Sequence, residues 1–367
     1  MDWGISRGFS LLCSIVITTS CLVKENQEGV HLDCRFNGMT SLNGQPTGKG
    51  ASVDLSHSGI SAPPDSPETG LVDSKFTNLS YNLLKTLIEN AFLGLQQLQT
   101  LDLSHNRVSA IQNKTFVGLT SLRTLRLGFN RLREVMAEVF YGLDQLTTLQ
   151  LNHNELSVIE NNTFDGLTSL QRLNLQSNTI LTLEVQAFKG LSALTVLDLS
   201  GNKLRYKHSS LPERVFAALR SLQELYIQDN NQDGIGDYPT NVFNDLAALK
   251  RLSIDSFHDV YFGADFAQLQ SLQNLDIDSN CRIGRLQNKS FDGLKSTCLQ
   301  SIRIIHCTRL FNIEAVYVDE DDDSVHLAQC VEHLDVSMNQ IRGNGLGLLG
   351  VLPRFKSLKS LRIQLVS

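Results

Sequence analysis

Asparagine recurs in this chain at a fixed interval of 24 residues. Ser58 lies one interval before the first asparagine of the series. A repeat held this strictly predicts one elongated array of stacked units, in which each unit contacts only its two neighbours. We call these positions the slots, and they are Ser58, Asn82, Asn106, Asn130, Asn154, Asn178 and Asn202.

The residues around each slot follow the frame L-x-x-L-x-L-x-x-N, which is the signature of leucine-rich repeats. This frame predicts the α/β leucine-rich repeat solenoid, a horseshoe with a parallel β-sheet on its concave face. In each Leu-x-Leu segment the leucines alternate with outward residues, as in a short strand with one buried face. These segments contain Leu101 and Leu103, Leu125 and Leu127, Leu149 and Leu151, Leu173 and Leu175, and Leu197 and Leu199.

The slot asparagines and a series of phenylalanines are predicted to be structural. Each asparagine turns the chain into the core, where its amide can bond backbone groups that would otherwise have no partner. Each of the first five asparagine slots is followed, ten residues later, by a phenylalanine. We expect these five rings to form a buried stack. The phenylalanines are Phe92, Phe116, Phe140, Phe164 and Phe188.

The chain divides into four segments on this pattern. Residues 1–20 have the layout of a secretory signal peptide: Arg7, then an apolar stretch, then small polar residues. We expect an amino-terminal cap over 21–52, regular repeats over 53–206 and irregular repeats over 207–367. The later slots are Asn230, Phe257, Asn280, Cys307 and Asn339, at intervals of 23 to 32 residues. Inserted loops of this kind are common sites of binding specificity.

Six cysteines remain after the signal peptide, an even number that indicates disulfides in an exported protein. Equivalent positions in adjacent coils lie at about the Cα separation that a disulfide needs. Register therefore predicts the pairs Cys281–Cys307 and Cys298–Cys330, with Cys21–Cys34 closing the cap. A zinc site formed by Cys281, His306, Cys307 and Cys330 is the alternative, but its spacing matches no compact ligand pair.

Four Asn-x-Ser/Thr sequons are consistent with export: Asn78, Asn113, Asn161 and Asn288. Three of them, Asn113, Asn161 and Asn288, share a position about seven residues after the slot. Glycans at these three would cover one rim of the solenoid and leave the other flank for contact. Asn78 is instead expected on the concave face near the cap.

The other candidate motifs point to no catalytic chemistry. The string Gly345-x-Gly347-x-x-Gly350 resembles a dinucleotide fingerprint, but it lies in a turn region and no acidic residue follows at the required spacing. The acidic run 319–323 lacks the glycine of a calcium loop. No nucleophile, base and acid fall at neighbouring register positions, so we predict neither an enzyme nor a cofactor.

Charge gives no specific evidence for a nucleic-acid partner, because the formal net charge is −6. Arg123, Arg126, Arg131 and Arg133 are divided between the inner face and the turns. The concave face of the irregular half is the remaining candidate ligand surface, with an acidic group on adjacent strands, although a solvated polar face is the plain alternative. Its predicted exposed residues are Glu224, Tyr226, Asp229, Asp255, Asp276, Asp278, Arg303, His306, His333 and Asp335.

Taken together, these features resemble the amino-terminal part of a Toll-like receptor ectodomain. The features are the signal peptide, the Cys21 to Cys34 cap, the segment Val53-Asp-Leu-Ser-His-Ser58, the Pro63-Pro64-Asp65 turn, the phenylalanine-bearing repeats and the later cysteines. The resemblance implies a horseshoe that recognises microbial or host-damage molecules and dimerises. It also implies signalling through a membrane span and a cytoplasmic Toll/interleukin-receptor domain.

The carboxy terminus departs from that family plan. The chain ends at Ser367 inside a strand-like segment, without a terminal cysteine-rich cap, a span or a signalling domain. We therefore expect a partial sequence or a truncated gene model, with a secreted decoy as the alternative. The competing function is a secreted or adhesive leucine-rich repeat protein that binds matrix or other protein partners.

Overall fold

The computed structural model describes twelve ranges of the chain. They are residues 22–26, 29–35, 52–63, 74–205, 207–230, 241–255, 266–277, 292–294, 297–305, 329–338, 353 and 355–364. The regular repeats are thus described almost without interruption. The predicted signal peptide, Cys21, Cys281, Cys307, Asp278, His306 and the sequon Asn288 lie outside these ranges.

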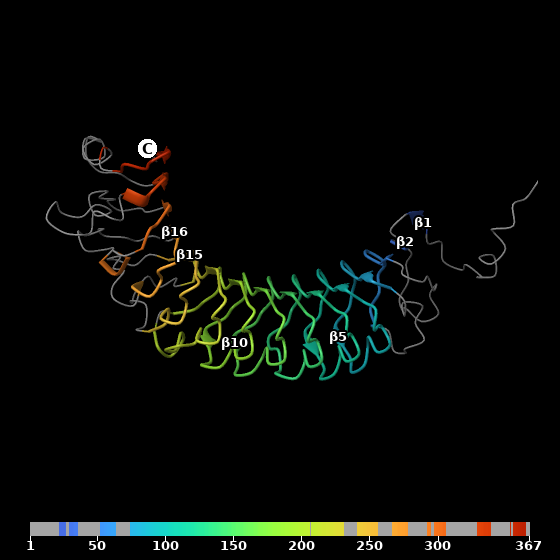
Figure 1. The fold of residues 1–367 in the computed structure, drawn as a ribbon. Coiled ribbons are helices and arrows are strands. Elements are labelled where there is room, and N and C mark those ends of the chain that lie inside the picture. The colour runs from blue at the N-terminus through green and yellow to red at the C-terminus, as the bar shows by residue number, and fades with distance from the viewer. Residues whose placement is uncertain are drawn as a thin grey trace, which may run out of the picture.

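One continuous sheet lines the concave side of the curved array (Figure 1). Among the described residues it has fifteen strands, which follow one another in chain order. The strands are β1 Leu22–Asn26, β2 Gly29–Asp33, β3 Ser52–Asp54, β4 Phe76–Asn78, β6 Thr100–Asp102, β8 Thr124–Arg126, β9 Thr148–Gln150, β11 Arg172–Asn174, β13 Val196–Asp198, β14 Glu224–Tyr226, β15 Arg251–Ile254, β16 Asn274–Ile277, β17 Ser301–Ile304, β18 His333–Asp335 and β19 Ser360–Arg362. The predicted leucine-rich repeat solenoid is confirmed.

Each sequence repeat forms one coil, and equivalent leucines pair in register from coil to coil. Leu101 pairs with Leu125, and Leu125 pairs with Leu149. All three side chains are fully buried. From β2 onward every pairing of neighbouring strands is parallel, whereas β1 and β2 form an antiparallel hairpin at the start of the sheet.

The side opposite the sheet consists mainly of turns (Figure 1). Two short parallel pairs lie there: β5 Thr86–Leu87 with β7 Ala110–Ile111, and β10 Val158–Ile159 with β12 Thr182–Leu183. The described carboxy-terminal part also contains a 3-10 helix, η2 Asp292–Leu294.

The slot asparagines join neighbouring coils through their side-chain amides. The Asn130 Oδ1 atom accepts a hydrogen bond from the backbone N–H of Val108 at 2.9 Å. Its Nδ2 atom donates to the carbonyl oxygens of Leu103 at 2.9 Å and Leu127 at 3.1 Å. The same pattern holds at the other asparagines through Asn230, and all of them are buried. The prediction of a structural role for the slots is confirmed.

The predicted phenylalanine stack is also confirmed. Phe140 lies between Phe116 and Phe164, with ring centroids 6.3 Å and 6.2 Å away. The stack continues past the regular repeats through Phe216 and Phe243 to Phe266. Their burial makes these rings part of the core rather than of a binding site.

The cysteines give one confirmed pairing. Cys298 and Cys330 form a disulfide with a Cα–Cα separation of 5.3 Å. Cys34 is also disulfide-bonded, but the partner predicted for it, Cys21, lies outside the described residues. The predicted pair Cys281–Cys307 lies outside them as well.

Candidate functional site

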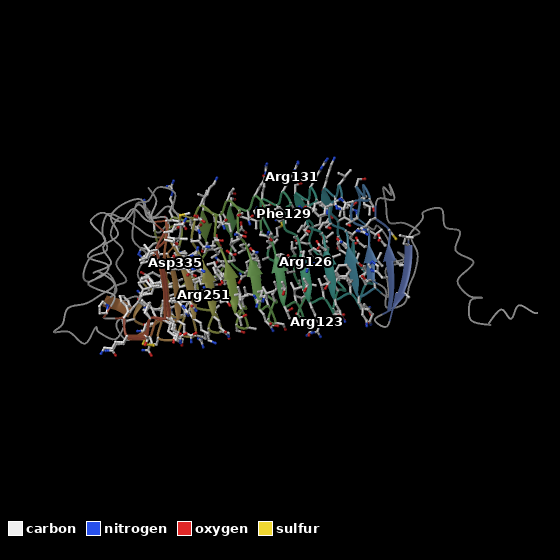
Figure 2. All side chains as sticks on the ribbon, turned by 90° about the horizontal axis from the view of Figure 1, so that it is seen from above. Arg123, Arg126, Phe129, Arg131, Arg251 and Asp335 are labelled. Carbon is white, nitrogen blue, oxygen red and sulfur yellow. A yellow bond between two sulfur atoms is a disulfide. The ribbon has the colours of Figure 1, made fainter. Side chains whose placement is uncertain are left out.

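The concave sheet presents two rows of outward side chains, one on each side of the buried residue at the centre of each strand, which is leucine in most of them (Figure 2). We call the row that follows the central buried residue the middle row. It contains, in register order, Asp33, Asp54, Asn78, Asp102, Arg126, Gln150, Asn174, Asp198, Tyr226, Ser253, Asp276, Arg303, Asp335 and Arg362. The inward residues repeat from coil to coil, whereas these outward residues differ in charge and size. Variation on this face can therefore select a partner without disturbing the core.

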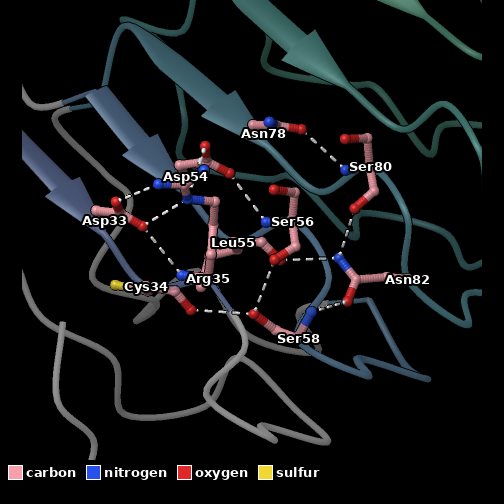
Figure 3. Close-up of polar contacts among 10 residues, drawn as sticks. All are labelled: Asp33, Cys34, Arg35, Asp54, Leu55, Ser56, Ser58, Asn78, Ser80 and Asn82. Carbon is pink, nitrogen blue, oxygen red and sulfur yellow. Dashed lines mark hydrogen bonds and ion pairs between the residues drawn. The ribbon is translucent and has the colours of Figure 1, made fainter.

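Several acids and amides of the middle row support their own strand ends. The Asp54 Oδ1 atom accepts the backbone N–H of Ser56, and the Asn78 Oδ1 atom accepts that of Ser80, both at 3.0 Å (Figure 3). Asp102, Asn174, Asp198 and Asp335 make the equivalent bond two residues along the chain. Such local bonds offer the backbone a partner where the strand turns. Polarity in this row is therefore partly structural.

Arginines neutralise the acids at the amino-terminal end of the row. Arg35 donates to Asp33 through its Nε and Nη2 atoms, at 2.8 Å and 2.7 Å (Figure 3). The hydrogen bond and charge of Asp33 raise the pKa of Arg35, which stays protonated. Arg126 pairs with Asp102 at 3.2 Å. Among the described residues of the first coils, these pairs partly neutralise the acids of the row.

A compact polar group lies on the first strands of the irregular half. The Tyr226 hydroxyl donates to Glu224 Oε2 at 2.7 Å, within β14. Arg251, which is the register neighbour of Glu224, donates to Asp276 Oδ2 at 2.9 Å. Burial, followed by the hydrogen bond to Glu224, raises the pKa of Tyr226 far above its ordinary value of 10.0, so the phenol stays neutral and remains a donor. We call Glu224, Tyr226, Arg251 and Asp276 the concave cluster.

Two of the three acids expected as a group on the concave face, Asp255 and Asp276, are buried, and the third, Asp278, lies outside the described residues. Asp276 has only 8% of its surface exposed and is ion-paired with Arg251. Its register neighbours are Ser253 and Arg303, and Arg303 is followed by Asp335 and then Arg362. From Asp276 to Arg362, acids and arginines thus alternate across the described strands of the middle row. Register predicts that these acids lie on adjacent strands, but it does not show that Arg251 pairs with Asp276.

Asp255 is a second correction, because its carboxylate belongs to the interior. The residue is only 5% exposed, and its two oxygens accept the backbone N–H groups of Asp229 at 2.6 Å and Asn230 at 2.9 Å. In the regular coils the N–H before the slot bonds a backbone carbonyl of the next coil, as Phe129 does with Asn152. Asp255 supplies that acceptor from a side chain, at a coil whose slot is Phe257 rather than asparagine.

The other predicted face residues vary in exposure. Asp229 and His333 are exposed, while Glu224, Tyr226, Arg303 and Asp335 are half-buried. Asp278 and His306 lie outside the described residues. A ligand role for this surface stays a prediction, now without Asp255.

Family models for the leucine-rich repeat match residues 51–108, 77–132, 120–180 and 169–232, and a further one matches 328–350. Together they cover more than half of the chain. The chain belongs to the leucine-rich repeat proteins. Members of this family typically bind partners rather than catalyse reactions. No curated protein sequence matches the chain.

Solved structures similar to this leucine-rich repeat protein come from several settings. A chain from the TLR13–ssRNA13 complex matches with 24% identity and a TM-score of 0.50, covering 84% of this chain and 49% of that one. A chain from an octameric complex of Latrophilin 3, Unc5D and FLRT2 matches with 21% identity and a TM-score of 0.65, covering 88% and 94%. An internalin from Listeria monocytogenes matches with 18% identity and a TM-score of 0.57, covering 86% and 82%. At these identities the likeness shows the fold, and the chain spans about half the length of the TLR13 chain.

The sequons of the leucine-rich repeat protein fall on two surfaces. Asn113 and Asn161 are exposed on the turns that follow the slots, as expected. Asn78 is in the middle row of the concave sheet. The sequon threonines Thr115 and Thr163 are buried, with hydroxyls that donate to the carbonyls of Gln112 and Glu160. Threonine therefore has a structural role in these two coils, and glycan occupancy stays a prediction.

One surface feature of the repeats escaped the sequence analysis. The residue before the slot carries an aromatic or histidine ring in five successive coils: His57, Tyr81, His105, Phe129 and His153. Neighbouring rings stack, with centroids 4.1 to 4.4 Å apart. Aligning the coils on the slot and reading the position before it would have revealed this series.

The described residues contain no group of three or more histidines, cysteines or acids that could hold a metal ion. Within the same ranges, no helix has the length and hydropathy needed to cross a bilayer.

The disulfide between Cys298 and Cys330 is the structural sign of an oxidising, extracellular environment.

Proposed function

We propose that this leucine-rich repeat protein is the ligand-recognition ectodomain of a Toll-like pattern-recognition receptor, acting by binding and dimerisation. The observation that carries the binding role is the concave sheet, whose interior is uniform and whose outward rows differ from coil to coil. The extracellular setting is supported by the Cys298–Cys330 disulfide. The partner class is a microbial or host-derived molecule.

The concave cluster is the part of the face best prepared for specific contact. Tyr226 offers a neutral ring and a hydroxyl, and Glu224 and Arg251 offer opposite charges on adjacent strands. The ion pair and the hydrogen bond hold these side chains in place before a ligand arrives, which lowers the ordering cost of binding. A partner with both polar and planar groups fits this arrangement.

A chimeric receptor tests the proposal. The chain is joined to the membrane span and Toll/interleukin-receptor domain of a characterised receptor, and a transcriptional reporter is read after exposure to fractionated bacterial and host-cell extracts. We expect at least one fraction to activate the reporter, and we expect Tyr226→Ala to reduce activation by about tenfold, because an aromatic anchor dominates many interfaces. Tyr141→Ala is the matched control, since Tyr141 is exposed outside the concave sheet.

The alternative is a secreted or adhesive protein that binds matrix or other protein partners. The match to a chain from the FLRT2-containing complex supports this alternative, because it covers 88% of this chain and 94% of that one. The receptor proposal would be contradicted if no fraction activated the reporter and the secreted chain bound saturably to extracellular matrix. That result would favour the adhesive function. Sequencing the mature message supplies a second test, because the receptor requires a reading frame that encodes a span and a signalling domain.

A further inference from the structure

The stacked rings form a continuous row along one rim of the concave sheet. Figure 2 shows Phe129 and Arg131 together on one rim, Arg126 in the middle of the face and Arg123 on the opposite rim. Each ring residue has a left-handed backbone, with φ between 52° and 57°. We call His57, Tyr81, His105, Phe129 and His153 the ring row.

The fold itself does not require aromatic residues in this row. Left-handed φ disfavours bulky side chains and suits glycine, asparagine or aspartate. Later coils indeed carry Ser177, Gly201 and Asp229 at the same position, also with positive φ. Tyr81 is nevertheless 48% exposed and Phe129 is 42% exposed. Exposed rings at a position that disfavours them point to a contact surface.

The stacking decides which groups of the ring row are available to a partner. Each inner ring has both faces covered by its neighbours, and interplanar angles are 6° to 16°. Only the ring edges face outward, and aromatic edges carry partial positive charge. The imidazole nitrogens and the Tyr81 hydroxyl add hydrogen-bond donors. The row therefore favours acceptor oxygens and gives no open inner face on which a nucleobase could stack.

Unpaired cations stand beside the ring row. Arg107 and Arg131 each follow a ring by two residues, in adjacent coils, and both side chains are exposed. Within the described parts of the chain neither makes an ion pair, whereas nearby Arg133 pairs with Glu155 at 3.0 Å. Equivalent backbone positions in adjacent coils are about 4.8 Å apart, so one anionic chain running along the rim can contact both arginines.

We propose that the ring row and the cations Arg107 and Arg131 bind a linear sulfated polysaccharide running along the rim. Sulfate oxygens would accept from the guanidinium groups, and the ring edges would line the polymer between them. A linear polyanion running along the rim meets both arginines, which lie in adjacent coils, and the ring edges beside them. Because the whole chain has a net charge of −6, attraction must come from this local patch.

Acidic pH is expected to strengthen the contact. Burial lowers the pKa of His105, with His153 and His57 acting in the same direction and Asp102 opposing them. The imidazole is thus mainly neutral at neutral pH and gains a proton as the pH falls below the ordinary histidine range. A neighbouring sulfate stabilises the protonated form, while the sulfate itself stays ionised. Affinity should therefore rise on acidification.

Calorimetric titration with a heparin octasaccharide tests the proposal on the full secreted chain, at about 150 mM salt where long-range attraction is screened. We expect the Arg107→Ala/Arg131→Ala variant to bind about tenfold more weakly than the wild type, because two charged hydrogen-bonding groups are lost. The control is Arg123→Ala/Arg220→Ala, which removes the same charge from two other exposed arginines. It should keep the wild-type affinity.

The histidines give an independent arm of the same experiment. Wild-type affinity should increase several-fold between about pH 7.5 and about pH 5.5, and His57→Asn/His105→Asn/His153→Asn should abolish the increase. Asparagine suits the left-handed backbone, so this variant should stay folded. Absence of octasaccharide binding, or equal weakening by both arginine pairs, would overturn the proposal. A DNA duplex of matched charge that bound as tightly and showed the same loss would overturn it in favour of nucleic acid.

Discussion

Replacing Asn130 with alanine should lower the free energy of unfolding by about 4 kcal/mol. The change removes the acceptor of the Val108 N–H and the donors to the Leu103 and Leu127 carbonyls. All of these groups are inside the solenoid, where no water replaces the lost partners, and each orphaned buried group costs about 1–3 kcal/mol. Urea denaturation monitored by circular dichroism measures the effect.

Asn152→Ala provides the matched control, because Asn152 lies in the next coil with a partly exposed side chain. Its stability should change by no more than about 0.5 kcal/mol, as is usual for surface substitutions. An Asn130→Ala protein as stable as this control would show that the amide ladder does not join the coils energetically.

Phe140→Ala should destabilise the protein by about 3–5 kcal/mol, the usual cost of removing a large buried ring. Phe140 is fully buried and contacts rings in the coils on both sides. The resulting cavity would interrupt the stack in the middle of the regular repeats, where neither neighbour can move far without disturbing its own coil. The midpoint of thermal or urea unfolding should fall accordingly.

The adjacent residue offers a strict comparison for that change. Tyr141 is 72% exposed, so Tyr141→Ala removes an aromatic ring of similar size without creating a cavity. Near-wild-type stability is expected for this variant. Equal destabilisation by the two substitutions would place Phe140 outside the core and contradict the predicted stack.

The interior of the fold was predictable from sequence because each coil must meet the same steric and hydrogen-bonding demands. A leucine, asparagine or phenylalanine at the wrong step would meet no counterpart above or below, so the period of 24 residues is strict. The Cys298–Cys330 pairing followed from the same logic, since disulfide geometry depends on register. These predictions used positions that the repeat constrains.

The outward positions were less predictable because the repeat does not constrain their partners. The sequence showed acids near Asp276 but not that Arg251 and Arg303 flank it across the sheet. Asp255 was expected on the surface, yet an irregular slot draws its carboxylate inward to bond backbone N–H groups. The ring row, in contrast, recurs at a fixed position directly before the slot, so the sequence repeat itself contains this signal.

Engineered disulfides test the stacked register most directly. Thr124 and Thr148 are register partners on β8 and β9, so Thr124→Cys/Thr148→Cys should form a disulfide under mild oxidation. Thr100 and Thr148 are two strands apart, at about 9.6 Å, and Thr100→Cys/Thr148→Cys should stay reduced under the same conditions. Peptide mapping that found the 124–148 link alone would agree with one continuous solenoid. Formation of the 100–148 link as readily, or failure of the 124–148 link in the folded protein, would contradict it.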